Sequence, residues 1–253
     1  MSAVRFCPEP PVETLKSLKG FYFFYLIEKN IAILKINAII KAEGRSIMSF
    51  KDLKTKAKES LKGHYGEAIK MILVYGLIAF VCGGVIGGIL GAAGAKEDII
   101  TFVSEIVTVI YTCLLGFGLE SFFLKLSRNE EVTWKELFSK TNMFVSYLVI
   151  SLLVGIFVTL WSLLLIIPGI IAALGYSQVY LVKLDNPEMG DFDAIKKSKE
   201  LMKGHKWEFF LLGLSFIGWM ILGIFTLGIL YLWLIPYMSV TMCNFYNELV
   251  SQK

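Results

Sequence analysis

Long apolar runs constrain this chain more than any other feature. Four stretches contain few charged residues: 71–94, 99–124, 143–184 and 207–246. A helix needs about 20 consecutive, mostly apolar residues to cross the hydrocarbon core of a bilayer, and the last two stretches are long enough to cross twice. Charged residues make up only 18% of the chain, against about a quarter in a soluble domain. The sequence therefore predicts a multi-pass integral membrane protein.

The two longest runs are expected to fold back near their centres. Pro168-Gly169 lies in the middle of the first run, and Gly223 and Gly228 lie in the middle of the second. Proline removes a backbone donor and glycine permits a positive φ, so both are typical of tight turns. The predicted fold is an all-α membrane domain with six transmembrane helices in three hairpins, each hairpin preceded by a short amphipathic interfacial helix. The predicted spans are residues 71–94, 99–124, 145–167, 170–184, 208–225 and 229–246.

Basic residues predict how the hairpins are oriented. From Met48 onward the chain has 18 Lys and Arg residues, and 17 of them lie outside the hairpin tips, which hold only Lys96. Short cytoplasmic loops are enriched in these residues, so we expect a cell-membrane protein with both termini in the cytoplasm. The expected partner of the basic inner rim is the anionic headgroup layer of the bilayer. The sequence has no basic stretch with interleaved aromatic residues, so we expect no nucleic-acid partner.

A repeated motif is expected to mark where the chain enters the membrane. Lys62-Gly63-His64 and Lys203-Gly204-His205 lie 141 positions apart. Flanking residues match at the same offset: Asp52 with Asp193, Lys58-Glu59 with Lys199-Glu200, and Glu67 with Glu208. Each copy is predicted as a short charged helix that ends at glycine, where the chain bends into an apolar span. The match indicates an internal duplication.

The helix before the first motif shows how such a segment would meet the membrane. Ser49 and Asp52 form an S-x-x-D start of the kind that caps a helix. Its apolar stripe is expected to face the headgroup boundary, with lysines outward; the stripe comprises Phe50, Leu53, Ala57 and Leu61. A weaker third copy is predicted at 132–138, where Thr133 and Glu136 have capping-box spacing.

Three stretches of the sequence resemble a known protein family. They are "AIKKSKELMKGHKWEFFLLGLSFIGWMILGIFTLGILYLWLIPYMSVTMCNFYNEL" at 194–249, "LLLIIPGIIAALGYSQVYLVKLDNP" at 163–187 and "LKTKAKESLKGHYGEAI" at 53–69. Together they resemble a bacterial family of integral membrane proteins labelled "domain of unknown function 975", from about Met48 to the C-terminus. The resemblance implies a multi-pass membrane protein whose biochemical role is not established. It brings no catalytic residues.

Residues 1–47 lie outside the resemblance. The apolar stretch 21–40 is interrupted by Glu28, Lys29 and Lys35, and a charge at mid-helix depth costs about 2.5–3.5 kcal/mol on insertion scales. A helix lying on the membrane surface is one interpretation of this stretch. We favour another, in which natural translation begins at Met48, so that 48–253 is a single polytopic domain.

The second predicted span carries the polar side chains that most suggest a function. Four polar residues of this span are spaced three, four and eight positions apart, which places them on one helix face. They are Glu105, Thr108, Thr112 and Glu120. A carboxylate inside a membrane is costly, so by default it marks a functional hypothesis. The plainer interpretation is that both acids reach the interfaces, with Glu120 pairing with Lys125, and that the hydroxyls join neighbouring helices.

The first span carries a stripe of small residues. Gly83, Gly87 and Gly91 recur at every fourth position, a spacing that lets two helix backbones approach closely in lipid. The partner helix is expected in the same chain, in another membrane protein or in a second copy of this chain. We expect packing here rather than ligand binding.

No metal, cofactor or catalytic motif is predicted. His64 and His205 are the only histidines and the four cysteines are scattered, whereas a zinc site needs three or four ligands. Neither a phosphate-binding loop nor a G-x-S-x-G motif is present. We therefore expect a non-catalytic protein, in membrane organisation or as an accessory subunit. The alternatives are a small-molecule or peptide permease component, and a lipid-modifying enzyme that uses Glu105 and Glu120.

Overall fold

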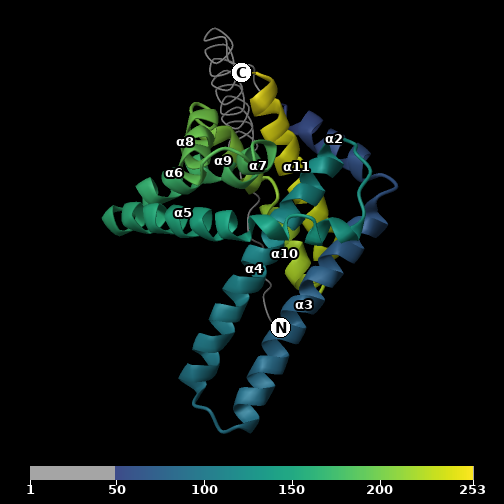
Figure 1. The fold of residues 1–253 in the computed structure, drawn as a ribbon. Coiled ribbons are helices and arrows are strands. Elements are labelled where there is room, and N and C mark those ends of the chain that lie inside the picture. The colour runs from purple at the N-terminus through teal and green to yellow at the C-terminus, as the bar shows by residue number, and fades with distance from the viewer. Residues whose placement is uncertain (1–48, 253) are drawn as a thin grey trace, which may run out of the picture. The chain divides into compact units, whose positions relative to one another are not determined.

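The computed structural model describes residues 49–252, and every regular element in that range is a helix (Figure 1). The expectation that translation begins at Met48 lies outside the described residues. The all-α architecture is as predicted. The long helices are α3 (Tyr65–Ala92), α4 (Glu97–Ser127), α5 (Phe144–Leu164) and α11 (Tyr231–Ser251). The shorter ones are α2 (Phe50–Leu61), η1 (Trp134–Phe138), η2 (Thr141–Met143), α6 (Ile166–Tyr176), α7 (Val179–Asp185), α8 (Asp191–Leu201), α9 (Lys206–Leu214) and α10 (Ile217–Phe225).

Five helical segments are long and apolar enough to cross a membrane, which supports a multi-pass membrane protein. They are Tyr65–Ala92, Glu97–Ser127, Trp134–Leu164, Ile166–Asp185 and Lys206–Phe225. The sixth predicted span, 229–246, falls within α11. That helix is not among the five, and its C-terminal half carries Asn244, Asn247 and Glu248.

Helices α3 and α4 form the hairpin that the sequence predicted first. They pack side by side, and Figure 1 shows their turn at the far end from the C-terminus. Gly94 supplies the positive φ of the turn, at +72°. Glu97 and Asp98 occupy the first turn of α4, where carboxylates are favoured by the helix dipole.

The second predicted hairpin is different from expectation. Its turn lies at Leu165, in extended conformation, and Pro168 sits in the first turn of α6, where proline is tolerated. The 11 residues of α6 rise only about 16 Å, roughly half the hydrocarbon core. The α5–α6 pair also extends across the direction of α3 and α4 (Figure 1). Helices α5 and α6 do pack against each other, but the predicted arrangement of six spans in three hairpins is not confirmed.

The last apolar run is interrupted twice. Ser215 and Phe216 separate α9 from α10, and Leu227 and Gly228 turn the chain into α11 with φ of +52° and +86°. The turn at Gly228 is where the sequence placed it. Pro236 lies inside α11 without ending it.

The duplication appears in the helix boundaries. Helices α2 and α8 start at Phe50 and Asp191, and α3 and α9 start at Tyr65 and Lys206, in both cases 141 positions apart. Burial follows the same offset, because Leu53, Ala57 and Leu61 are buried and so are Ala194, Ser198 and Met202. Two copies of one local structure, a short helix followed by a glycine bend, are thus present.

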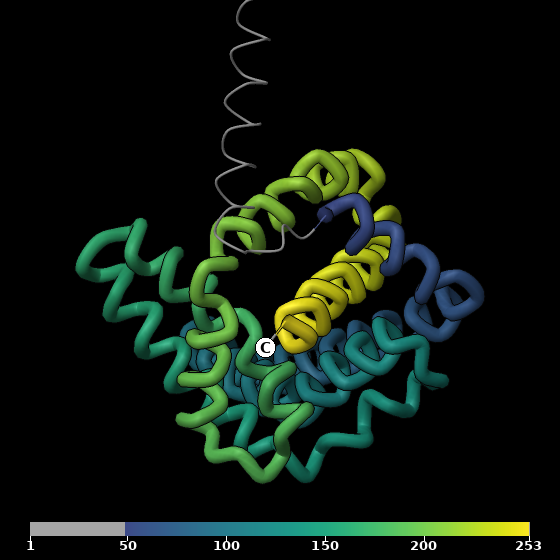
Figure 2. The backbone as a smooth tube through the Cα atoms, turned by 90° about the horizontal axis from the view of Figure 1, so that it is seen from above, coloured from purple at the N-terminus to yellow at the C-terminus, as the bar shows by residue number. Residues whose placement is uncertain are grey.

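The apolar stripe of α2 does not face a headgroup layer. Leu53, Ala57 and Leu61 are each at most 3% exposed, and Leu53 belongs to a cluster with Phe245 and Leu249 of α11. Figure 2 looks down on α11, which packs against α2, α3 and α4. The prediction was wrong because α11 offers an apolar face that covers the stripe more completely than headgroups would. Ser49 does cap α2, accepting the Asp52 amide at 3.4 Å.

The third predicted copy is only a short 3₁₀ helix. Thr133 makes no side-chain capping bond, so the predicted capping box is absent. Glu136 instead accepts from Ser121 of α4 at 2.9 Å and pairs with Lys125 at 2.9 Å. These tertiary partners take the carboxylate away from the helix start and bind η1 to α4.

Candidate functional site

The predicted polar face of α4 is divided between different surroundings. Glu105 and Thr108 are exposed, and Thr112 and Glu120 are partly buried. Glu105 and Glu120 are 15 residues apart, about 22 Å along an α-helix. The four side chains therefore do not form one site, and Glu120 lines a cavity of its own.

Glu120 lines a cavity of about 300 Å³ among α4, α7, α9 and α11. The polar residues of its wall are Glu120, Ser177, Gln178, Tyr180, Ser239 and Cys243. Phe209, Met238 and Met242 complete much of the rest. Oxygen-bearing side chains from residues 177–180 and from α11 thus line the same cavity as the Glu120 carboxylate.

A break in the helix between α6 and α7 creates part of this wall. Ser177 donates its hydroxyl to the Leu174 carbonyl at 2.9 Å, and the Gln178 amide nitrogen donates to Ser177 Oγ at 3.1 Å. A serine that bonds the backbone of the preceding turn competes with helix continuation. The polar pair Ser177-Gln178 within an apolar run was the available sequence signal, and the sequence-based interpretation did not use it.

Glu120 makes no hydrogen bond or ion pair with any residue in the described range. Its predicted partner Lys125 is bound instead to Glu136, so the pairing expected from the sequence is wrong. The reason is that η1 packs on α4 and brings the competing carboxylate to Lys125. A charged group removed from water without a partner is costly, and a cation in the cavity would offset that cost.

Aromatic rings stiffen the region around Glu120. Tyr147 and Tyr180 stack with ring centroids 4.6 Å apart, and Phe117 meets Tyr147 edge-on at 5.0 Å. The Tyr180 hydroxyl lies 2.9 Å from Ser151 Oγ. Packed aromatic pairs of this kind add stability beyond area burial, so the cavity has a well-fixed side.

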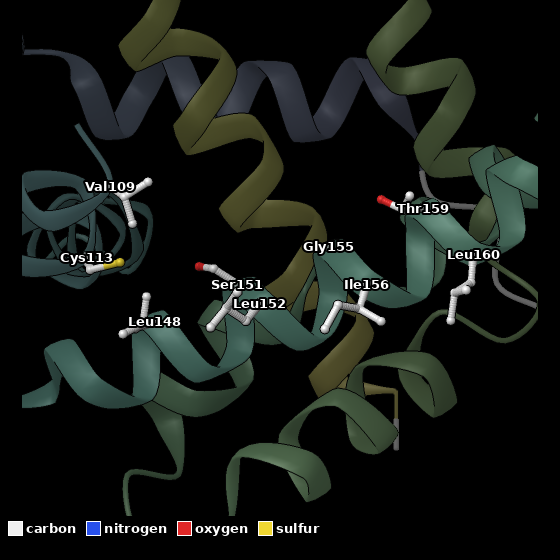
Figure 3. Close-up of a pocket in the computed structure, with 9 residues that line it drawn as sticks. All are labelled: Val109, Cys113, Leu148, Ser151, Leu152, Gly155, Ile156, Thr159 and Leu160. Carbon is white, nitrogen blue, oxygen red and sulfur yellow. The ribbon is translucent and has the colours of Figure 1, made fainter. Parts of the chain in front are cut away.

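A second hollow lies between α4 and α5 and is almost wholly apolar. It measures about 500 Å³ and is lined by the nine residues labelled in Figure 3. Ser151 carries a hydroxyl that could bind a ligand, but this hydroxyl already donates to the Tyr147 carbonyl at 2.7 Å. Its lining contains neither a carboxylate nor a histidine, and an apolar surface suited to lipid chains is the simplest interpretation.

The two Lys-Gly-His turns share a backbone conformation. Gly63 and Gly204 have φ of +89° and +92°, and His64 and His205 follow with φ of −109° and −111°. Lys62 and Lys203 are exposed. Both glycines form the bend that the sequence predicted, immediately before the apolar helices α3 and α9.

The side chains of the two turns differ. His205 Nδ1 lies 2.8 Å from Glu208 Oε2. In the first copy Glu67 pairs with Lys70 at 2.7 Å and accepts the Trp134 amide at 3.2 Å, while the buried His64 Nδ1 has no partner. Packing of η1 against α3 explains why the first carboxylate is occupied. The described range holds no group of three or more metal-ligating side chains.

The predicted glycine stripe of α3 meets no neighbouring helix within the described chain. A Cβ added at Gly83, Gly87 or Gly91 would find no atom within 4 Å. Close backbone contact occurs elsewhere: a Cβ at Gly118 of α4 would lie 2.0 Å from the Leu137 carbonyl oxygen. Sequence spacing found the more regular stripe but not the glycine that packs.

A polar network joins the ends of three helices. Arg128 donates to both carboxylate oxygens of Asp185, at 2.8 and 2.7 Å, and to Asn247 at 3.1 Å. Tyr246 donates to Asp185 at 2.9 Å. The hydrogen-bonded carboxylate of Asp185 raises the pKa of the Arg128 guanidinium above its usual value. The network fixes α7 and α11 at the C-terminal end of α4. These three helices also contribute residues to the wall of the Glu120 cavity.

Comparison with known protein families agrees with the resemblance seen in the sequence. The family described as "Protein of unknown function (DUF975)" matches residues 48–173 and 162–253. The chain belongs to the DUF975 family. Neither the curated proteins nor the solved structures contain a match. Membership in DUF975 therefore brings no assigned activity, and the function of this member has to be argued from its own geometry.

Proposed function

We propose that this DUF975 protein is a non-catalytic multi-pass membrane protein that binds a small cationic solute in the Glu120 cavity, as a component of a permease. The observation that carries the proposal is the unpaired Glu120 carboxylate in a polar-lined cavity of about 300 Å³. An ionisable residue inside a membrane segment is a functional-site hypothesis by default. A bound amine or other small cation supplies the missing charge partner.

Size and lining support a small solute. Ligand pockets range from about 300 to 1,000 Å³ and combine apolar walls with a few convergent polar groups. The cavity lies at the lower end of that range, and the hydroxyl-bearing residues Ser177, Ser239 and Tyr180 line it together with Glu120. Phe209 adds an aromatic face, which attracts a cation electrostatically.

Broken helices favour a permease over a purely structural protein. Many transporters place their solute sites beside discontinuous helices, and the α6–α7 break at Ser177-Gln178 forms part of this cavity. The lipid-modifying alternative gains nothing from the geometry, because Glu105 and Glu120 are about 22 Å apart along α4.

Charge-selective labelling inside the cavity tests the proposal. Ser239→Cys, in a chain whose native cysteines are replaced, places a thiol in the cavity wall. We expect a cationic methanethiosulfonate reagent to modify it at least about ten-fold faster than an anionic one, since one charge interaction of about 1.4 kcal/mol gives that ratio. Adding Glu120→Gln should remove the preference.

The control for this labelling is Glu105→Gln, which removes an exposed carboxylate from the same helix. It should leave the rate ratio unchanged. Equal rates for both reagents with Glu120 intact, or a preference that survives Glu120→Gln, would contradict a cation site. Uptake of small amines into reconstituted vesicles then distinguishes a permease from a binding protein.

Membrane organisation is the second candidate, favoured by the open face of α3. Gly83, Gly87 and Gly91 form a flat stripe with no neighbour in the described chain, and such stripes suit self-association in lipid. The partner in this proposal is a second copy of the chain. Cytoplasmic termini and location in the cell membrane also belong to the proposal, supported by the distribution of basic residues.

A further inference from the structure

A third pocket, unrelated to Glu120, lies where α5 and α6 meet α8 and α9. It measures about 200 Å³ and combines two lysines, Lys199 and Lys206, with an apolar wall. Trp161, Pro168, Ile171 and Tyr176 are the main members of that wall. Two cations and a hydrophobic surface therefore occupy the same small space.

Lys206 is held in place by α6. Its ammonium group donates to the Ile171 carbonyl at 3.1 Å, and a Cβ on Gly175 would lie 3.1 Å from the same nitrogen. The missing side chain of Gly175 thus leaves room for the lysine to cross α6. An ammonium group has three donors, so two remain for a ligand.

No carboxylate lines this pocket. Two acids on α8 and α9 are occupied elsewhere, Asp191 with Lys183 at 3.0 Å and Glu208 with His205 at 2.8 Å. Like charges that share a pocket repel each other unless an anion lies between them. The chemistry of the pocket therefore calls for an anion.

The apolar wall continues onto the outer surface of the protein. Trp161 and Ile171 are 49% and 48% exposed, and in a membrane protein such surfaces face acyl chains. The pocket is smaller than the pockets that enclose whole small molecules, so it fits one end of a larger molecule. A lipid whose headgroup contacts the two lysines and whose acyl chains lie along Trp161 and Ile171 fits both the charged and the apolar part of this pocket.

We propose that this pocket binds the phosphate headgroup of an anionic phospholipid. Lys199 and Lys206 contact the phosphate, and the exposed apolar wall carries the upper part of the acyl chains. Basic pockets between membrane helices commonly hold such headgroups. The proposal is independent of the solute cavity at Glu120, which different residues form.

The first copy of the duplicated unit lacks this pair. At the offset of 141, Lys199 corresponds to Lys58 and Lys206 corresponds to Tyr65. Lys58 lies over the Tyr237 ring, 5.8 Å from its centroid, and therefore already has an intramolecular partner. The lipid site is thus expected once in the molecule, in the second copy.

Native mass spectrometry of the full chain in detergent tests the proposal, with phosphatidylglycerol and phosphatidylcholine offered at equal concentration. We expect one phosphatidylglycerol to be retained in preference to phosphatidylcholine. Each lysine near a headgroup contributes roughly five-fold to binding, so Lys199→Gln with Lys206→Gln should weaken retention about thirty-fold. Lys199→Arg with Lys206→Arg should keep it.

Two controls make the result specific. Lys196→Gln with Lys197→Gln removes the same charge from exposed residues of α8 and should change retention by less than about two-fold. Gly175→Ala shifts the Lys206 ammonium by a few tenths of an ångström without any change of charge, and should reduce retention to a smaller extent than the double glutamine variant. It supplies a second measurement if the double glutamine variant does not fold.

Three outcomes would overturn the site. One is equal retention of both lipids by the unaltered chain. Another is an equal loss in the two double glutamine variants, which would mean that only net charge matters. The third is displacement of phosphatidylglycerol by inorganic phosphate at millimolar concentration, which would show that the pocket recognises a free anion rather than a lipid.

Discussion

Gly63 and Gly204 hold the bends that precede α3 and α9, with φ of +89° and +92°. A residue with a Cβ is disfavoured in this conformation by about 1–2 kcal/mol. No atom lies within 4 Å of a Cβ built at either glycine, so the cost of a substitution there is conformational and not steric. The two bends are therefore a clean place to measure backbone strain.

We expect Gly63→Ala combined with Gly204→Ala to lower the free energy of unfolding by about 2–4 kcal/mol. His64→Gln with His205→Gln should cost less than about 1.5 kcal/mol, because only the hydrogen bond between His205 and Glu208 is lost. Denaturant unfolding in mild detergent, followed by circular dichroism, measures both.

The control is Gly66→Ala with Gly213→Ala. Both glycines lie inside helices with open space around them, so alanine should be neutral or stabilising there. A larger effect from the histidine pair than from the bend glycines would show that the motif works through its imidazoles.

At the scale of elements, the glycines of α3 and α4 have different packing roles. Gly118 lets α4 touch the backbone of η1, since a Cβ would lie 2.0 Å from Leu137 O. Gly87 in α3 meets nothing within 4 Å. One glycine therefore determines packing within the chain, and the other leaves a surface on which a second helix can pack.

We expect Gly118→Ala to destabilise the protein by about 1–3 kcal/mol, because the clash is with backbone that cannot rotate away. Gly87→Ile should leave the stability of the monomer nearly unchanged. It should reduce co-purification of two differently tagged copies if α3 mediates self-association. Unchanged co-purification would contradict the second candidate function, and a neutral Gly118→Ala would contradict the close α4–η1 contact.

At the scale of the whole molecule, one end gathers most of the short polar helices. Helix α2 packs on α11, and Arg128, Asp185 and Asn247 join the ends of α4 and α7 to α11. The α3–α4 turn lies away from that end (Figure 1). The distribution of basic residues predicts that the molecule has a cytoplasmic face and an outer face.

Cysteine labelling in intact cells tests that orientation. In a chain whose native cysteines are replaced, cysteine at Lys96 or at Leu227, which is 93% exposed, should react with an impermeant thiol reagent. Cysteine at Lys197 on α8 should react only after the membrane is permeabilised. Labelling at Lys197 in intact cells would reverse the proposed orientation.

Local physics explains what the sequence alone determined. Apolar runs of sufficient length predicted an all-helical membrane protein, and the Lys-Gly-His repeat predicted bends that the structure has at Gly63 and Gly204. Helix periodicity, hydropathy and the freedom of glycine to adopt positive φ depend on neighbours in the chain. The duplication is likewise a property of sequence, and α2 and α8 preserve it.

Only the tertiary structure decided which partner each side chain meets. Lys125 pairs with Glu136 and not with Glu120. The apolar stripe of α2 packs against α11, and Lys199 and Lys206 line one pocket beside α6. Each outcome depends on segments far apart in the chain, whose approach is set by packing that no local pattern encodes. The cavity at Glu120 and the two-lysine pocket exist because of those long-range contacts, which is why the sequence could name Glu120 but not the space in front of it.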